Sequence, residues 1–205
     1  MKEFDWVILI DLWNEEDIVK SLLESEPWTN TLNYRDNYKV LINNLNHFNY
    51  KNILFYNAMI HEPKGLTYYD IDNSIQDWIG KQKMIYKTKR NYYTHDGWEI
   101  ESFVSKHFKS TDTFLIGGQS WRACVHARDV GFIKMFNSGL DIYSSPTICI
   151  NGEGMVHGFC AHRDFKSDED VEWEYIGDLL FKPIALKENG YKRLEGHLNK
   201  TFSVK

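Results

Sequence analysis

Cys124 is the residue whose surroundings in the sequence are best suited to chemistry. It follows an apolar run at residues 113–116 and a turn of small residues, Gly118-Gln119-Ser120, and it stands near the start of a helix predicted over residues 122–137. The unpaired backbone N–H groups and the dipole at a helix N-terminus stabilise a thiolate relative to a thiol. We therefore expect Cys124 to act as a nucleophile at neutral pH. From the residues alone, the alternative is a small apolar side chain packed beneath a helix, which is common for a free cysteine.

Two charged residues follow other apolar runs in the same way. Asp11 ends the run at residues 7–10, and Lys87 ends the run at residues 83–86. Open parallel sheets place their active sites at the carboxyl ends of strands, so we expect a carboxylate, an ammonium group and the sulfur of Cys124 to lie together. Lys89, two residues further along the same strand face, is an alternative to Lys87. Asp11 taken alone also fits a loop or capping residue.

Apolar runs alternate with helical patterns through the first two-thirds of the chain. Strands are predicted at residues 5–12, 52–56, 83–87, 112–116 and 140–143, and helices at residues 15–24, 36–47, 96–108 and 122–137. Short connections between such elements predict right-handed crossovers. The pattern therefore predicts an α/β fold, with three αβα layers around a doubly wound, mostly parallel sheet. In the second helix, Val40, Leu41 and Leu45 are predicted to face inward.

Several other segments do not follow this alternation. Residues 62–72 are predicted to form a loop, and residues 74–80 at most a short helix. Residues 147–150 and 155–159 flank a glycine-rich turn, which predicts a C-terminal hairpin inserted after the parallel strands. One more strand is predicted at residues 179–186, where Pro183 argues against a central position.

One group of residues in the last third has the types of a metal site: His157, Cys160, His162 and Asp164. In a strand, however, Cys160 and His162 share one face while His157 points to the other. Packing within the hairpin is therefore the prediction for this group. The charged run at residues 166–170 is predicted to be solvated surface.

Composition places the chain in a broad class. Its 205 residues predict a single domain over 1–205, and its net charge of −5 gives no electrostatic reason to expect a nucleic-acid partner. No apolar stretch approaches the roughly 20 residues that span a bilayer, and the N-terminus is too acidic for a signal peptide. Three cysteines, an odd number, do not make a disulfide framework. These features predict a cytoplasmic protein without membrane contact.

Three blocks of the sequence together resemble the isochorismatase-like cysteine hydrolases, which include nicotinamidases, N-carbamoylsarcosine amidohydrolases, ureidoacrylate hydrolases and isochorismatases. Residues 7–14 are similar to the family's strand ending in Asp-x-Gln-Asn. Residues 87–93 are similar to its Lys followed after six positions by an aromatic residue. Residues 118–125, followed by Ala127, Arg128 and Asp129, are similar to Gly-x-x-Thr-x-x-Cys-Val and a downstream Ala-Arg-Asp. The resemblance covers residues 5–145 and is weak beyond them.

This resemblance implies a catalytic triad of Asp11, Lys87 and Cys124. It also implies a cis peptide bond before Ser120, and an oxyanion hole formed by the backbone N–H groups of Ser120 and Cys124. The aromatic residue six positions after Lys87 favours Lys87 over Lys89 as the triad cation. Association into a homodimer or a higher homo-oligomer is expected, because proteins of this fold commonly associate.

The chain also departs from the family pattern. Trp13 stands where the family has Gln, and Ser120-Trp121 replaces an Ala-Thr pair. His61 fits a metal-binding histidine of the nicotinamidases, but Met59 occupies the position of their aspartate, two residues before it. A histidine without that carboxylate makes a poor metal site, so no catalytic metal and no cofactor are expected.

Large side chains are predicted around the mouth of the pocket. Trp13, His61, Tyr92 and Trp121 are the candidate substrate-binding residues, although core or interface packing fits each of them equally well. Tryptophans at positions 13 and 121 would narrow the cavity and favour a small or planar substrate.

The prediction for function is a hydrolase that cleaves the C–N bond of a small amide, ureido or carbamoyl compound through a thioester. The alternative from another class is a catalytically inactive binding or assembly module with the same fold. A vinyl-ether hydrolase of the isochorismatase type is a third hypothesis, which needs no nucleophilic cysteine.

Overall fold

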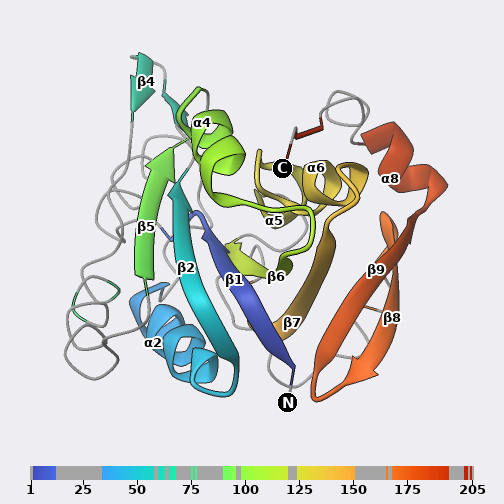
Figure 1. Cartoon of the computed structure of the whole chain (residues 1–205), viewed down its shortest axis with the longest axis horizontal. Helices are drawn as coiled ribbons and strands as arrows, with labels where there is room; N and C mark the ends of the chain where they lie inside the picture. Colours follow the sequence, from blue (N-terminus) through green and yellow to red (C-terminus); the bar gives the residue numbers. More distant parts are fainter. Residues whose placement is uncertain are drawn as a thin grey trace, which may run out of the picture.

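The apolar run near the N-terminus forms strand β1 (Glu3–Ile10), which lies inside a seven-stranded sheet (Figure 1). The computed structural model describes residues 2–12, 34–57, 60–62, 65–67, 75, 77, 90–95, 98–119, 124–150, 165, 168–193, 201, 202 and 204. Val7 and Leu9 of β1 belong to one hydrophobic cluster, whereas Ile8 and Ile10 belong to another. Because both faces of β1 are covered from Trp6 to Ile10, this part of the strand is continuously apolar and does not alternate with polar residues.

Six further strands complete the sheet: β2 (Asn49–Asn57), β5 (Arg90–His95), β6 (Thr113–Gln119), β7 (Asp141–Ile150), β8 (Val171–Gly177) and β9 (Leu180–Leu186). Their order is β5-β2-β1-β6-β7-β9-β8. Neighbours from β5 to β7 pair in parallel, while β9 is antiparallel to both β7 and β8. The predicted α/β class with a mostly parallel sheet is confirmed.

Helices contribute to both of the hydrophobic clusters that include residues of β1. Helix α2 (Tyr34–Leu45) contributes Leu41 and Leu45 to the cluster that contains Val7. Helix α4 (Trp98–His107) and helix α6 (Phe132–Asn137) contribute to the cluster that contains Ile8. The helices predicted at residues 36–47 and 96–108 are therefore confirmed. The inward orientation predicted for Val40 is wrong: its side chain is 46% exposed, because it lies outside the helical stripe that holds Leu41 and Leu45.

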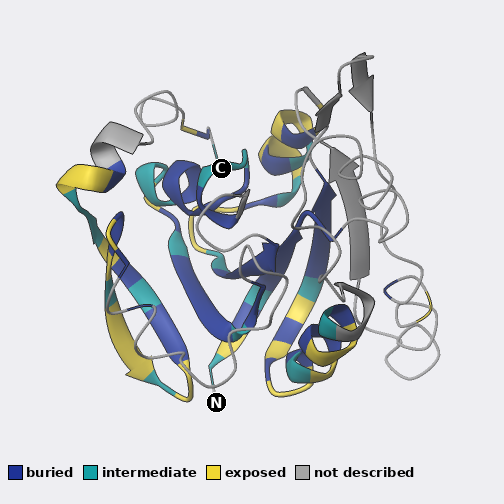
Figure 2. Cartoon of the chain, turned by 180° about the vertical axis from the view of Figure 1, so that it is seen from behind, coloured by how far each residue is buried: buried dark blue, intermediate teal, exposed yellow. Residues whose placement is uncertain are grey.

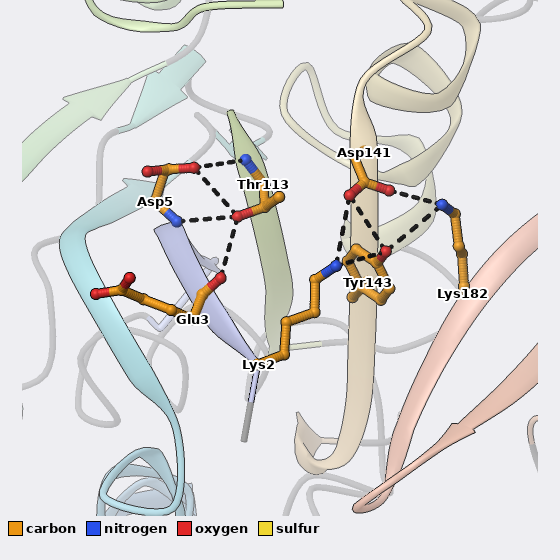
Figure 3. Close-up of polar contacts among 7 residues, drawn as sticks. All are labelled: Lys2, Glu3, Asp5, Thr113, Asp141, Tyr143 and Lys182. Atoms are coloured by element: carbon orange, nitrogen blue, oxygen red, sulfur yellow. Dashed lines mark hydrogen bonds and ion pairs between the residues drawn. The ribbon is translucent and has the colours of Figure 1, made fainter. Parts of the chain in front are cut away.

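Polar side chains join the strands near the amino end of β1 (Figure 3). The carboxylate of Asp5 accepts a 3.0 Å hydrogen bond from the backbone N–H of Thr113, which joins β1 to β6. Asp141 of β7 accepts hydrogen bonds from the ammonium group of Lys182 at 2.7 Å and from the hydroxyl of Tyr143 at 3.2 Å. Lys182 lies on β9, so this contact joins the parallel part of the sheet to the antiparallel part.

The helix predicted over residues 122–137 is interrupted. Helix α5 (Cys124–Ala127) ends before Arg128, and α6 begins only after Gly131. The backbone N–H of Gly131 donates to the carbonyl oxygen of Arg128 at 2.8 Å. A Cβ atom at Gly131 would lie 2.7 Å from the carbonyl oxygen of Val125, so the tight turn there requires glycine. The prediction of one continuous helix is therefore wrong. Apolar residues recur at helical spacing on both sides of the turn, so the sequence pattern does not reveal the interruption.

The C-terminal part of the sheet also differs from the prediction. Strand β7 continues to Ile150, so residues 147–150 prolong the fifth strand and are not a separate strand. Residues 151–164, which include the return strand predicted at residues 155–159 and the group of His157, Cys160, His162 and Asp164, lie outside the described residues. The strand predicted at residues 179–186 is β9.

Strand β8 was not predicted, and it gives β9 a neighbour on each side. Pro183 of β9 pairs with Trp173 of β8, where the register shifts between Glu172 and Trp173. Such an irregularity accommodates a residue that has no N–H to donate. Figure 2 shows β8 as the most exposed strand among those coloured by burial, at the border of the sheet opposite β5.

The remaining described elements include a short ribbon after β2 and a helix after β9. Strands β3 (Ile60–Glu62) and β4 (Gly65–Thr67) pair antiparallel, so part of the loop predicted at residues 62–72 forms a small ribbon. Strand β5 pairs with β2 on the side away from β1. The strand predicted at residues 83–87 and the helix predicted at residues 15–24 lie outside the described residues. Helix α8 (Glu188–Arg193) follows β9. Among the described helices, none combines the length and apolar character needed to cross a membrane.

Candidate active site

The direction in which strands are added to the sheet changes between β1 and β6. From β1 the chain adds β2 and β5 on one side, and it then returns to add β6 and β7 on the other. In open parallel sheets such a change leaves a crevice at the carboxyl ends of the two strands, where ligands bind. Asp11 directly follows β1, and α5, which follows β6, begins at Cys124. The candidate carboxylate and the backbone of the candidate nucleophile thus follow neighbouring strands.

Asp11 is wholly buried and has an unusual backbone conformation. Its φ of 55° lies in the left-handed region, which aspartate enters more readily than most residues. Its backbone N–H donates a 2.8 Å hydrogen bond to the carbonyl oxygen of Tyr56, so β1 remains attached to β2 at this point. Residues in such conformations concentrate at functional sites, because the surrounding structure must hold them.

The carboxylate of Asp11 pairs with a guanidinium group. Nε of Arg128 donates to Oδ2 of Asp11 at 2.7 Å, and the Arg128 side chain is 30% exposed. A buried carboxylate needs a charged or hydrogen-bonding partner, and this contact provides one. Arg128 lies just beyond α5, four residues after Cys124. The ion pair therefore joins the end of β1 to the segment that begins with Cys124.

Sequence reasoning included Arg128 in a similar block but gave it no role. The two partners are separated by 117 positions along the chain, and no local pattern predicts such a contact. Two further polar residues at strand ends were also missed. Gln119 of β6 and Asn57 of β2 are 5% and 3% exposed, respectively. The signal that could have found them is a polar residue directly after a buried apolar run.

Helix α2 holds one of these two residues in place. The hydroxyl group of Tyr38, which is wholly buried, donates a 2.5 Å hydrogen bond to Oε1 of Gln119. This bond connects the helix on one face of the sheet with the last residue of β6. Gln119 is five positions before Cys124, so α2 helps to fix the end of the strand that precedes the candidate nucleophile.

A second cysteine lies near the same end of β6. Cys149 is opposite Gly118 in the pairing of β6 with β7, and its Sγ is 3.4 Å from Oγ of Ser144. Burial raises the pKa of the Cys149 thiol to about 12, although the hydrogen bond with Ser144 acts in the opposite direction. Cys149 is therefore a neutral thiol at physiological pH and provides an internal comparison for Cys124.

The other predicted site residues are placed less completely. For Cys124, His61 and Tyr92 the structure describes the backbone but not the side chain. His61 pairs with Leu66 in the β3–β4 ribbon, and Tyr92 pairs with Leu54 within the main sheet. The remaining candidates lie outside the described residues: Trp13, Lys87, Lys89, Ser120 and Trp121. The described part of the site consists of Asp11, Arg128 and the start of α5.

A separate group of ionisable side chains includes His126, the second residue after Cys124. Asp168 and Asp170 lie beside it and are 0% and 5% exposed, so the prediction of a solvated run at residues 166–170 is wrong for both. Glu169, between them, is exposed as predicted. The physical reason is that Asp168 accepts hydrogen bonds from the backbone N–H of Asp170 at 3.0 Å and from Nε1 of Trp173 at 2.9 Å.

No family model, no curated protein and no solved structure matches this chain. The resemblance to isochorismatase-like hydrolases therefore remains a prediction that rests on three short blocks of sequence.

Proposed function

We propose that this chain is a cytoplasmic cysteine hydrolase that cleaves the C–N bond of a small amide, ureido or carbamoyl compound. In this proposal the fold is three-layered αβα and doubly wound. The catalytic residues are Asp11, Lys87 and Cys124. The observation that carries the proposal is the 2.7 Å contact between Arg128 and Asp11, because it ties a buried carboxylate to the segment that begins with Cys124.

Each proposed group has a defined part in the reaction. Asp11 accepts the proton of the Cys124 thiol while Lys87 stabilises the thiolate, and the sulfur then attacks the carbonyl carbon. The backbone N–H groups of Ser120 and Cys124 stabilise the resulting oxyanion, each by about 3–4 kcal/mol. When the C–N bond breaks, the proton passes from Asp11 to the leaving nitrogen. Water then hydrolyses the thioester, which releases the acid and returns the thiol.

An inactive binding or assembly module is the second candidate, and one observation favours it. Oδ2 of Asp11 is already engaged by Arg128, so this carboxylate has a structural task whether or not it transfers protons. In such a module, Asp11 and Arg128 would only hold β1 against the segment after α5.

Turnover of a panel of small amides, ureido acids and N-carbamoyl amines tests the proposal, with release of ammonia or amine as the readout. We expect Cys124→Ala to abolish turnover and Cys160→Ala to retain it. In Asp11→Asn, we expect turnover to be lost and the pH profile of Cys124 alkylation by iodoacetamide to change. Absence of turnover, together with alkylation of Cys124 no faster than that of Cys149, would indicate the inactive module. Turnover of a vinyl ether that survives in Cys124→Ala would indicate the third hypothesis.

We also propose that the chain forms a homodimer or a higher homo-oligomer. Four large apolar side chains of the β8–β9 hairpin support this: Tyr175 (46% exposed), Ile176 (45%), Leu179 (38%) and Ile184 (48%). Apolar surface of this kind favours association. Sedimentation of the wild type should give a mass above that of one chain, and Ile184→Lys should lower it. A wild-type protein that sediments as a monomer would exclude this part of the proposal.

A further inference from the structure

Three ionisable side chains meet in the interior between α5 and the start of β8. Nε2 of His126 lies 3.5 Å from Oδ2 of Asp168, and Nδ1 of the same ring lies 3.8 Å from Oδ2 of Asp170. One possible ligand atom from each residue can be chosen so that all three lie within 4.8 Å of one another, and all three residues are buried. Two carboxylates in such a place need compensation for the water that they lose.

The distances from the His126 ring to the two carboxylates are too long for direct hydrogen bonds. A hydrogen bond between a protonated imidazole and a carboxylate is about 2.7–2.9 Å long, well below either distance measured at His126. In contrast, two ligand atoms on one tetrahedral metal ion are separated by about 3.4 Å when the metal–ligand bonds are about 2.1 Å. The 3.5 Å between His126 and Asp168 is close to that separation.

We propose that His126, Asp168 and Asp170 bind a divalent transition-metal ion such as Mn²⁺ or Zn²⁺. The ion binds Nε2 of His126 and Oδ2 of Asp168, and water completes its coordination. Asp170, whose Oδ2 lies 3.8 Å from Nδ1 of His126, supplies a third oxygen. Two carboxylates and a neutral imidazole carry a charge of −2, which a divalent ion neutralises.

Neighbouring residues hold Asp168 and His126 in place. Trp173 donates to Oδ2 of Asp168 at 2.9 Å, and the backbone N–H groups of Asp170 and Val171 donate to Oδ1 at 3.0 and 3.4 Å, so the carboxylate is oriented from both sides. The ring of Phe132 packs edge-on against His126 and against Trp173, with centroid distances of 5.7 and 4.6 Å. Aromatic walls exclude water and strengthen metal–carboxylate attraction.

The position of the proposed ion suggests a structural task. His126 belongs to α5, which begins at Cys124, whereas Asp168 and Asp170 precede β8. An ion bound to residues of both segments would fasten the β8–β9 hairpin to α5. This inference is independent of the proposed hydrolase activity, because the same task would stabilise an inactive module.

Binding of Mn²⁺ to the full chain tests the proposal. Mn²⁺ is chosen because thiolates prefer softer metals, so the three cysteines compete little for it. After dialysis against EDTA, titration followed by the EPR signal of free Mn²⁺ should show one bound ion per wild-type chain, and Mn²⁺ should raise Tm. His126→Gln and Asp168→Asn should lose this binding, while Asp170→Asn should weaken it by about 10–100-fold. Glu169→Gln is the matched control, since Glu169 is exposed between the two aspartates, and it should bind as the wild type does.

Two outcomes would overturn the proposal. One is a wild-type chain that does not bind Mn²⁺ in the titration and does not change its Tm with Mn²⁺, Zn²⁺ or EDTA. This measurement needs no variant and does not depend on whether buried substitutions fold. The other is binding that is unchanged in a folded His126→Gln variant, which would place the metal elsewhere in the chain.

Discussion

Gly118 lies so close to Ile10 that a Cβ atom at Gly118 would overlap the carbonyl oxygen and the amide nitrogen of Ile10. The backbone of Gly118 has a φ of 121°, which residues with a side chain rarely adopt. Ile10 and Gly118 are also paired in the parallel ladder of β1 and β6. The close approach at this pair therefore determines where Asp11, the next residue, leaves the sheet.

Gly118→Ala should be strongly destabilising for this reason. Left-handed strain and overlap with a neighbouring backbone together predict a loss of about 3–5 kcal/mol in the free energy of unfolding. Gly139→Ala is the control, because Gly139 also has a positive φ of 71° but no atom lies within 4 Å of its ideal Cβ. Strain alone predicts a loss of about 1–2 kcal/mol there. Urea unfolding measures both values, and equal losses would contradict the role assigned to the contact with Ile10.

Removal of the Arg128 guanidinium should destabilise the protein through Asp11. Arg128→Ala leaves a buried carboxylate without this partner, and we expect a loss of about 2–3 kcal/mol, reduced from the value for a fully buried pair because Arg128 is 30% exposed. In an Asp11→Asn background, the same substitution should cost much less. A double-mutant cycle measured by urea unfolding should therefore give a coupling energy above about 1 kcal/mol. Additive losses would show that the ion pair contributes nothing beyond packing.

The Asp141 contacts in Figure 3 predict a dependence of stability on acid. Burial opposes ionisation of Asp141, but hydrogen bonds from Lys182 and Tyr143 outweigh it and hold the pKa below the usual 3.8. The folded state therefore binds fewer protons than the unfolded chain at low pH, and stability falls as the pH drops from 3.8 through the folded pKa. Asp141→Asn should lose less stability than the wild type between about pH 5 and about pH 3. The same slope in both proteins would exclude this contribution.

Local patterns predicted those parts of the fold whose burial follows from the chain itself. Strand β1 is continuously apolar from Trp6 onward, and α2 and α4 have apolar residues at helical spacing, so all three were predicted within a few residues of their ends. Strand β8 was missed because most of its residues are only partly buried or exposed, with Glu172 and Glu174 among them. A strand stabilised by a neighbour and not by its own apolar face has a weak sequence signal.

Contacts between distant segments explain the other differences. The burial of Asp168 and Asp170 depends on Trp173 and on His126, which is 42 and 44 positions away along the chain. The pairing of Asp11 with Arg128 likewise depends on how β1 meets the segment after α5. Sequence reasoning found Asp11 because it ends an apolar run, but its partner becomes visible only in three dimensions.

Cys149 provides a prediction at alkaline pH. Burial raises its folded pKa from 9.0 to about 12, so an unfolded chain loses the thiol proton before the folded one does. Stability is then fully present below about pH 9 and is lost by up to about 1.4 kcal/mol per pH unit as the pH rises toward 12. Cys149→Ala should show a smaller loss over the same interval, because tyrosine and lysine titrations are common to both proteins. In the folded wild type, Cys149 should also resist iodoacetamide up to about pH 9 and react at once in urea. Rapid alkylation of Cys149 in the folded state, or equal slopes in the two proteins, would show that the thiol is not held neutral by burial.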